Sequence, residues 1–172
     1  IYEGMPGSEL VMQGLAIARA VHDRYAAAKR NPFNEIECSD HYARAMAVYG
    51  VFLATCGYEY HGPHGRISFT PRLTPENFRC PFTAAEGWGT FSQSRKGRAQ
   101  TNEVEIKWGR LCLKTMAFEL PQGATLKSST VSIGARQIST KAIQAGQRVE
   151  LKLTDEVTLK AKPRGYRPDL SS

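Results

Sequence analysis

The sequence predicts an α+β chain in which a pair of helices precedes an antiparallel β-sheet or sandwich. Apolar residues recur at helical spacing through the first third of the chain, whereas from Thr101 onward they alternate with polar residues at a period of two. The stretch between these parts is rich in proline and glycine, which is typical of loops and short strands. We therefore divide the chain into residues 1–57, 58–100 and 101–165, with a frayed tail at 166–172.

A first helix is expected from Ser8 to Arg30, with Ser8 or Gly7 as its N-cap. Its apolar face consists of Leu10, Gly14, Ile17, Val21 and Tyr25. Asn31 precedes Pro32 and ends the helix, because a residue before proline avoids the α region. A second helix follows after a short connection, so the two should pack as antiparallel neighbours.

The second helix is strongly apolar and should end at Gly57. Its start has two alternatives, Asn34 in a capping-box spacing or the Ser39–Asp40 pair. The apolar stripe consists of Tyr42, Met46, Tyr49, Leu53 and Cys56. If the helix already includes residue 37, three polar side chains share one face within two turns, at Glu37, His41 and Arg44. These features predict a core helix whose N-terminal end is polar.

The segment 58–100 should carry one strand at Arg66–Thr70. Its histidines, His61 and His64, have no carboxylate at a recognised ligand spacing, so we expect no metal there. Trp88 lies between two glycines, which allow a close backbone approach, and its indole can stack on a sugar ring. The alternative is that Trp88 closes an interface between the sheet and the helices.

The remaining segment predicts about six short strands. Val104, Ile106 and Trp108 share one phase of the alternation, which places Trp108 in the core. The phase slips near Lys114–Thr115, as at a β-bulge, and a further strand is expected at Val131–Ile133. Turns, the first of them a hairpin, are expected at Gly109–Arg110, Pro121–Gly123 and Asp155–Glu156.

The charge distribution and the cysteines narrow the function classes. Residues 1–93 hold 8 basic and 9 acidic side chains, whereas residues 94–172 hold 15 and 7. Lysines of the basic half fall at alternating strand positions, which indicates a solvated sheet face rather than a nucleic-acid site. No apolar run approaches the ~20 residues of a membrane span. The four cysteines lack any zinc or redox spacing, so we expect free thiols, which favour a reducing compartment such as the cytoplasm, although no targeting signal assigns the localisation.

Three stretches of the first half carry a family resemblance. NPFNEIECSDHYARAM, CGYEYHGP and PRLTPENFRCPFTAAEGWGTF resemble the C-terminal part of glycoside hydrolase family 116, which contains the non-lysosomal glucosylceramidase and bacterial β-glucosidases. The resemblance implies that residues 1–57 are the last helices of an (α/α)6 barrel. It also implies a retaining mechanism in which the Glu nucleophile and Asp acid/base lie upstream, so that this chain is a fragment of a longer polypeptide.

The resemblance assigns sugar binding to this part of the chain, with a β-linked glycoside or glycolipid as substrate and no metal or cofactor. An acidic residue before the last helix and an arginine inside it contact glucose hydroxyls, and we map them to Glu37 and Arg44. Glu35 is the alternative carboxylate, and His41 shares the polar face. An ionised carboxylate accepts and a guanidinium donates, as hydroxyl recognition requires. A local salt bridge of Arg44 with Glu37 or Asp40 at the start of the helix is the alternative.

A second function class remains open. The β module could be a non-catalytic sandwich that binds carbohydrate or a protein partner, with the helices belonging to a neighbouring domain. A row of aromatic side chains on one exposed sheet face would favour this class. The isolated helix pair should in either case expose apolar surface, because two barrel helices without their neighbours leave their inner faces uncovered.

Overall fold

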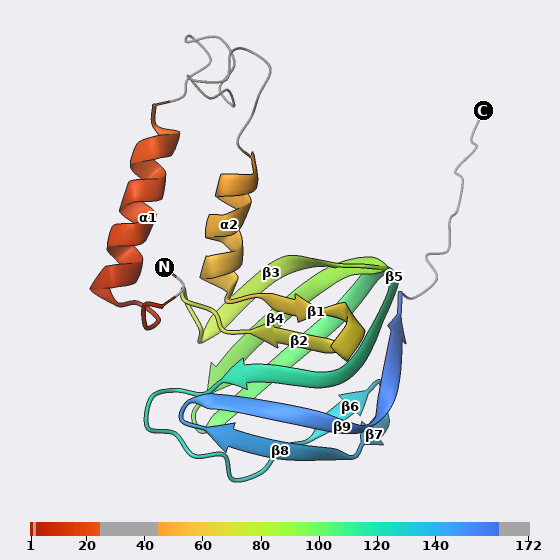
Figure 1. The fold of residues 1–172 in the computed structure, drawn as a ribbon. Helices are drawn as coiled ribbons and strands as arrows, with labels where there is room; N and C mark the ends of the chain where they lie inside the picture. The colour runs from red at the N-terminus through yellow and green to blue at the C-terminus, as the bar shows by residue number, and fades with distance from the viewer. Residues whose placement is uncertain (2, 25–44, 162–172) are drawn as a thin grey trace, which may run out of the picture.

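The computed structural model describes residues 1, 3–24 and 45–161. In these residues the chain has a mixed α+β fold, with two α-helices followed by strands that mostly belong to one curled sheet (Figure 1). The elements in order are α1 Glu9–His22, α2 Ala45–Cys56, β1 Glu59–His61, the 3-10 helix η3 Gly62–His64, β2 Arg66–Phe69, β3 Asn77–Ala84, β4 Gly87–Lys96, β5 Ala99–Glu119, β6 Val131–Ile133, β7 Arg136–Ile138, β8 Thr140–Ala145 and β9 Arg148–Lys160.

Helix α1 begins where the capping pattern predicts. The Ser8 hydroxyl accepts a hydrogen bond from the backbone N–H of Val11 at 3.4 Å, which satisfies one of the first unpaired amides. The helix ends at His22, and Arg19 forms an ion pair with the C-cap residue Asp23 at 2.7 Å. The expected continuation to Arg30 lies outside the described residues. Val11 is buried, but the predicted apolar face is open, and Ile17 is 68% exposed.

Helix α2 runs back toward the sheet, antiparallel to α1 (Figure 1). It ends at Gly57 as predicted, because Gly57 has φ +55° and a Cβ there would collide with the carbonyl group of Thr70. Val48 on this helix is 70% exposed, which agrees with the expected uncovered apolar surface. The alternative helix starts at residues 34 and 39 lie outside the described residues. Neither described helix is long and apolar enough to span a bilayer.

Strand β5 organises the sheet. The strand order is β1-β2-β5-β4-β3, with β9 paired to β5 and β8 to β9. The first half of β5 pairs with β4, and its second half lies between β9 and β2. The β2–β5 pair is parallel, and the other strand pairs of the described residues are antiparallel. One strand therefore joins both halves of the curled sheet.

Two predicted turns are wrong, because the chain continues through them as strand. Strand β5 passes through Gly109–Arg110 without a hairpin, and the positive φ of Gly109, +72°, accompanies a shift in strand register. Strand β9 passes through Asp155–Glu156, where its register with β5 is irregular. An apolar pattern broken by a bulge resembles two strands joined by a turn.

Other predicted features of the β region are confirmed. The register of β5 shifts between Leu113 and Thr115, at the expected bulge. The turn at Pro121–Gly123 is closed by a hydrogen bond from Ala124 N to Pro121 O at 3.0 Å. Strands β2 and β6 form close to the expected positions. Strands β3 and β4 were not predicted, because the only strand placed in residues 58–100 was Arg66–Thr70, and β3 pairs with β4 over its whole length.

Stacked aromatic rings form the centre of the hydrophobic core. Phe69 of β2 is completely buried, and its ring lies 4.0 Å from that of Phe91 on β4, with 2° between the ring planes. Phe82 meets Phe69 edge to face at 5.7 Å, and Phe118 stacks on Phe91 at 6.0 Å. These rings come from β2, β3, β4 and β5, so the core holds the two halves of the sheet together.

The described cysteines are free thiols, as the spacing predicted. Cys56 at the end of α2 and Cys80 of β3 are buried in the core, and Cys112 of β5 is partly exposed. The two buried thiols act as small apolar groups that attach the helix to the sheet.

Candidate functional site

The sugar-binding residues expected from the sequence divide into two groups. Glu35, Glu37, His41 and Arg44 lie among residues 25–44, outside the described residues, so their roles stay predictions. Trp88 lies in β4, in the described part of the sheet. The candidate site is therefore built outward from Trp88.

Trp88 is the middle of a row of side chains that crosses three strands. Its register partner on β5 is Trp108, and its partner on β3 is Thr83. Trp88 is 47% exposed and Trp108 is 63% exposed. Directly paired side chains on one face of antiparallel strands lie close enough to interact. The two indoles therefore project from paired positions on one exposed face of the sheet, and we call Thr83, Trp88 and Trp108 the tryptophan row.

The expectation that Trp108 belongs to the core is wrong, and a bulge is the reason. Trp88 pairs with Trp108, but the next residue, Gly89, pairs with Ile106, so Lys107 has no partner on β4. One extra residue reverses the side chains that follow it to the other face. Ile106 is thus buried and Trp108 exposed. The sequence held a signal, because the next buried residue, Leu111, is five positions after Ile106, an odd spacing that simple alternation cannot give.

The glycines on either side of Trp88 serve the pairing of the strands. A Cβ on Gly87 would lie 2.6 Å from the carbonyl oxygen of Trp108, and one on Gly89 would collide with the carbonyl oxygen of Glu105. The close approach expected from these glycines is therefore made to strand β5. It fixes the backbone positions from which both indoles project.

Helix α2 meets the tryptophan row at Thr83. The Tyr49 hydroxyl lies 3.1 Å from the Thr83 hydroxyl, and Tyr58 donates a hydrogen bond to the Thr83 carbonyl at 2.6 Å. Burial raises the pKa of Tyr58 well above its ordinary value, so this phenol stays protonated and can donate. Tyr49 remains exposed, and it extends the aromatic surface from the sheet to the helix.

Charged groups border the tryptophan row. Arg110 binds Glu86 through two hydrogen bonds, of 2.5 and 3.0 Å, at the turn that precedes Trp88. Lys107 pairs with Glu105 at 2.6 Å. Hydrogen bonding from Arg110 lowers the pKa of Glu86, and hydrogen bonding from Lys107 lowers that of Glu105. A flat apolar surface bordered by ionised donors and acceptors suits a ligand with apolar ring faces and hydroxyl edges.

Substituting Arg110 with alanine should raise the pKa of Glu86 toward its ordinary value, because the hydrogen bonds that stabilise the carboxylate are removed. The Glu86 pKa is depressed in the folded state, so the pair contributes stability above the unfolded-state pKa and loses it as pH falls through the folded-state pKa. NMR titration of the Glu86 side chain measures the change. Lys114→Ala, which removes the 3.1 Å ion pair with Glu156, is the matched control and should leave the pKa of Glu86 unchanged.

His61 and His64, for which the sequence predicted no metal, contact each other. Their rings stack at 4.3 Å, and His64 N donates to His61 Nδ1 at 3.3 Å. Within residues 1, 3–24 and 45–161 no group of three or more His, Cys, Asp or Glu side chains is arranged to hold a metal ion.

No protein-family model matches the chain. No curated protein matches it either.

Proposed function

We propose that this chain is the C-terminal part of a retaining β-glycosidase that resembles glycoside hydrolase family 116. It contributes residues that bind the sugar of a β-linked glycoside or glycolipid, and the catalytic carboxylate pair belongs to an upstream part of the same polypeptide. Retaining hydrolysis needs two carboxyl groups about 5–5.5 Å apart, one as nucleophile and one as acid/base. The support is the sequence resemblance of residues 31–46, 56–63 and 71–91, together with the exposed tryptophan row.

The tryptophan row is the single structural observation that carries the sugar-binding part of this proposal. Two large aromatic residues are register partners on neighbouring strands, and their exposed fractions are 47% and 63%. Contiguous exposed apolar surface marks an interaction site more often than scattered apolar residues do. Indoles with hydrogen-bonding neighbours suit a pyranose, whose ring faces are apolar and whose edges are hydroxylated.

The helix pair supports an origin in a larger helical assembly. Exposed apolar side chains recur on both helices, at Leu10, Met12, Ile17, Val21, Val48 and Tyr49. A helix that exposes its apolar residues lacks a packing partner. Neighbouring helices of an (α/α)6 barrel would cover these residues, as the proposal requires.

Glu37 and Arg44 hold the glycone in this proposal, with Glu35 as the alternative carboxylate and His41 beside them. Arg44 donates to a sugar hydroxyl and the carboxylate accepts from one, so the two orient the sugar over the upstream nucleophile.

Hydrolysis of an aryl β-glucoside tests the proposal. The 172-residue chain alone should show no turnover, and the longer polypeptide should be active. In that polypeptide, Arg44→Lys keeps the charge but removes the planar fork of donors. We expect kcat/KM to fall roughly ten- to a hundred-fold, which corresponds to a loss of about 1.5–3 kcal/mol of transition-state stabilisation. Turnover by the isolated chain would contradict the fragment proposal. A change below about twofold would instead indicate a surface pair between Arg44 and Glu37 or Asp40.

The second function class, a non-catalytic module that binds carbohydrate or a protein partner, gains support from the same tryptophan row. An exposed aromatic row on one sheet face is the feature that this class requires, and Trp108 supplies its second member. The two classes differ in one measurable respect. A non-catalytic module binds its ligand unchanged, whereas hydrolysis by the longer polypeptide would release the glycone.

A further inference from the structure

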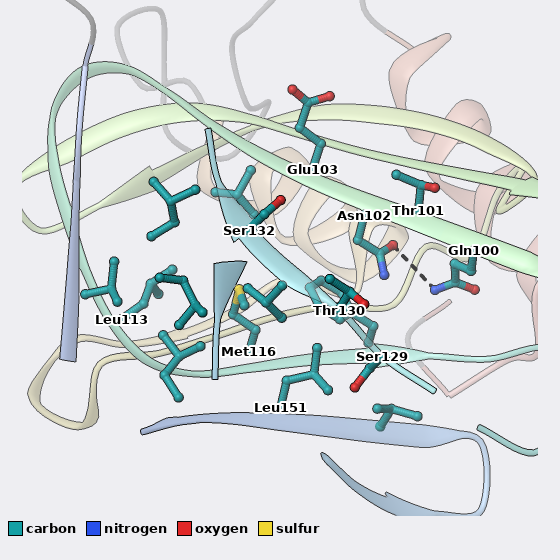
Figure 2. A pocket seen from close by; sticks show the side chains of 18 of the residues that line it. Gln100, Thr101, Asn102, Glu103, Leu113, Met116, Ser129, Thr130, Ser132 and Leu151 are labelled. Carbon is teal, nitrogen blue, oxygen red and sulfur yellow. Dashed lines mark hydrogen bonds between the residues drawn. The ribbon is translucent and has the colours of Figure 1, made fainter. Parts of the chain in front are cut away.

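The interior of the curled sheet contains a cavity of about 730 Å³ that the core does not fill (Figure 2). This volume lies within the range of about 300–1,000 Å³ found for small-molecule sites. Its walls are mainly apolar side chains of β5 and β9, among them Met116, Phe118, Leu151, Leu153 and Leu159. Water gains few hydrogen bonds against such walls, so the cavity favours an apolar occupant.

One rim of the cavity is polar but carries no cation. Gln100 and Asn102 of β5 line it with amide groups, and Ser129 and Thr130, just before β6, line it with hydroxyls. The lining residues include one acidic residue, Glu103, whose exposed side chain points away from the cavity (Figure 2), and no lysine or arginine. An anionic headgroup would therefore find no counter-charge among the lining residues. A neutral headgroup that bears hydroxyls matches the rim.

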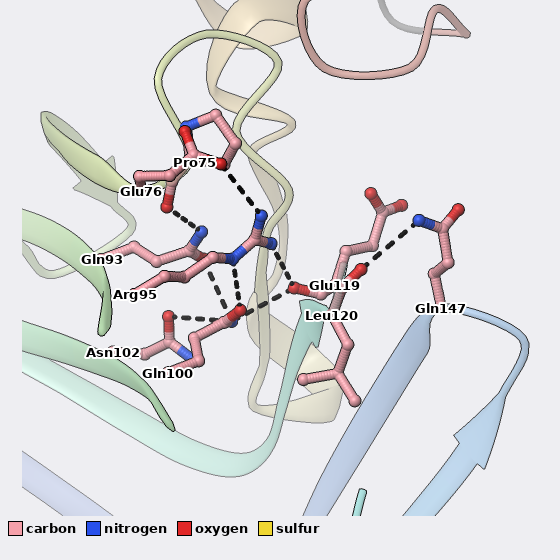
Figure 3. Close-up of polar contacts among 9 residues, drawn as sticks. All are labelled: Pro75, Glu76, Gln93, Arg95, Gln100, Asn102, Glu119, Leu120 and Gln147. Atoms are coloured by element: carbon pink, nitrogen blue, oxygen red, sulfur yellow. Dashed lines mark hydrogen bonds and ion pairs between the residues drawn. The ribbon is translucent and has the colours of Figure 1, made fainter. Parts of the chain in front are cut away.

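Hydrogen bonds fix the amides of the rim in place (Figure 3). Gln100 Oε1 accepts from Arg95 Nε at 2.8 Å, and Gln100 Nε2 donates to the Glu119 carbonyl at 3.1 Å. Arg95 also donates to that carbonyl at 3.1 Å, so its guanidinium hydrogen-bonds to groups of the protein on both sides. Asn102 Oδ1 accepts from Gln100 Nε2 at 3.4 Å, which orients the Asn102 amide nitrogen as a donor for a ligand.

The β6–β7 hairpin covers one side of the cavity. Ser132, Ile133 and Ile138 of this hairpin line it, yet within the described residues β6 and β7 pair only with each other. The segment before the hairpin is attached through Gln144, which accepts from Leu126 N at 2.8 Å and donates to Ala124 O at 2.9 Å. A short hairpin without ladder bonds to the large sheet opens at lower free energy than the core strands do. Opening of the β6–β7 hairpin would provide an entry path for a ligand.

We propose that this cavity binds one neutral amphipathic molecule, an alkyl or acyl chain with a hydroxyl-bearing headgroup. The chain lies against Met116 and Leu151, and the headgroup contacts Asn102 and Thr130. This site lies on the face of the sheet that is opposite to the tryptophan row, and it does not depend on the proposed hydrolytic function.

Calorimetric titration of the 172-residue chain with monodecanoylglycerol, below the concentration at which it aggregates, tests the proposal. We expect saturable one-to-one binding with a negative heat-capacity change. Met116→Trp fills the cavity and should weaken binding by about ten-fold or more, because the ligand and the indole cannot both fit. Met12→Trp, the same substitution on the exposed face of α1, is the matched control and should leave the affinity within about twofold.

The headgroup is tested with two further ligands and one variant. Decanoate, with the same chain and an anionic head, should bind about ten-fold or more weakly than monodecanoylglycerol, and glycerol alone should not bind. Asn102→Leu should weaken monodecanoylglycerol binding. This second variant tests the site independently, so the test remains decisive if Met116→Trp fails to fold. Absence of saturable binding, equal affinity for decanoate, an unchanged affinity in Asn102→Leu, or binding that survives in a folded Met116→Trp protein would overturn the proposal.

Discussion

Replacing Phe69 with alanine should lower the free energy of unfolding by about 3–5 kcal/mol, the largest stability effect we expect from a single substitution in this chain. Phe69 is completely buried, and its ring contacts those of Tyr58, Phe82 and Phe91. Removing the ring leaves a cavity where β2, β3 and β4 meet, and the surrounding rings cannot collapse into it without leaving their stacked positions. Urea unfolding followed by circular dichroism measures the loss.

Phe52→Ala is the matched control for this prediction. Phe52 lies on α2 at the edge of the core and is only partly buried, stacked on Tyr49 at 5.8 Å. The same substitution there should cost less than half as much, since less apolar surface is withdrawn from water. A loss below about 1 kcal/mol for Phe69→Ala, or equal losses at the two positions, would contradict the placement of the core.

The double substitution Trp88→Ala and Trp108→Ala should abolish measurable binding of cellopentaose to the chain, and each single substitution should weaken it by about ten-fold. The indoles supply the flat apolar surface on which a pyranose face can lie, and no other exposed side chain of the row replaces them. Calorimetric titration at millimolar oligosaccharide measures the affinities. Both side chains are exposed, so the unfolding free energy should change by about 1 kcal/mol or less.

Ile17→Ala is the control for the loss of exposed apolar surface, because this position on α1 is as exposed as the tryptophans. It should leave cellopentaose binding unchanged. If the native chain does not bind the oligosaccharide, or if the double variant binds as well as the native chain, the tryptophan row is a packing surface for protein rather than a sugar site. Hydrolysis by the longer polypeptide would remain a separate question, decided by its turnover of an aryl β-glucoside.

Local signals in the sequence were sufficient for the ends of elements. Ser8 caps α1 through its own hydroxyl, and Gly57 ends α2 because its backbone needs a positive φ. The slip at Lys114–Thr115 was visible as a break in alternation and is a register shift in the sheet. Each of these features depends on residues within one turn of a helix or one strand pair, so a short window of sequence contains its cause.

Features that depend on distant strands were not predictable in this way. The alternation around Ile106 placed Trp108 in the core, because the odd spacing from Ile106 to Leu111 indicates a break in phase but does not show that β4 leaves Lys107 unpaired. The same bulge made one long strand resemble a hairpin. The amphipathic cavity required β5, β9 and the segment before β6 to converge, although they are far apart in the sequence. Of the expected sugar-binding residues only Trp88 lies in the described structure, so the roles of Glu35, Glu37, His41 and Arg44 rest on the sequence.

Strand β5 also determines the order in which this protein can fold during synthesis. Residues 66–69 find their parallel partner only in residues 115–118, and β4 finds its partner in the first half of the same strand. The β2–β5 pairing is distant in the sequence and slow to form, whereas β4 and β5 are consecutive strands of a hairpin in which Lys96 pairs with Ala99. Until residues 115–118 have left the ribosome, β2 exposes an unpaired edge, which is a template for aggregation. A pause in translation before β5 would therefore be more harmful than one after it.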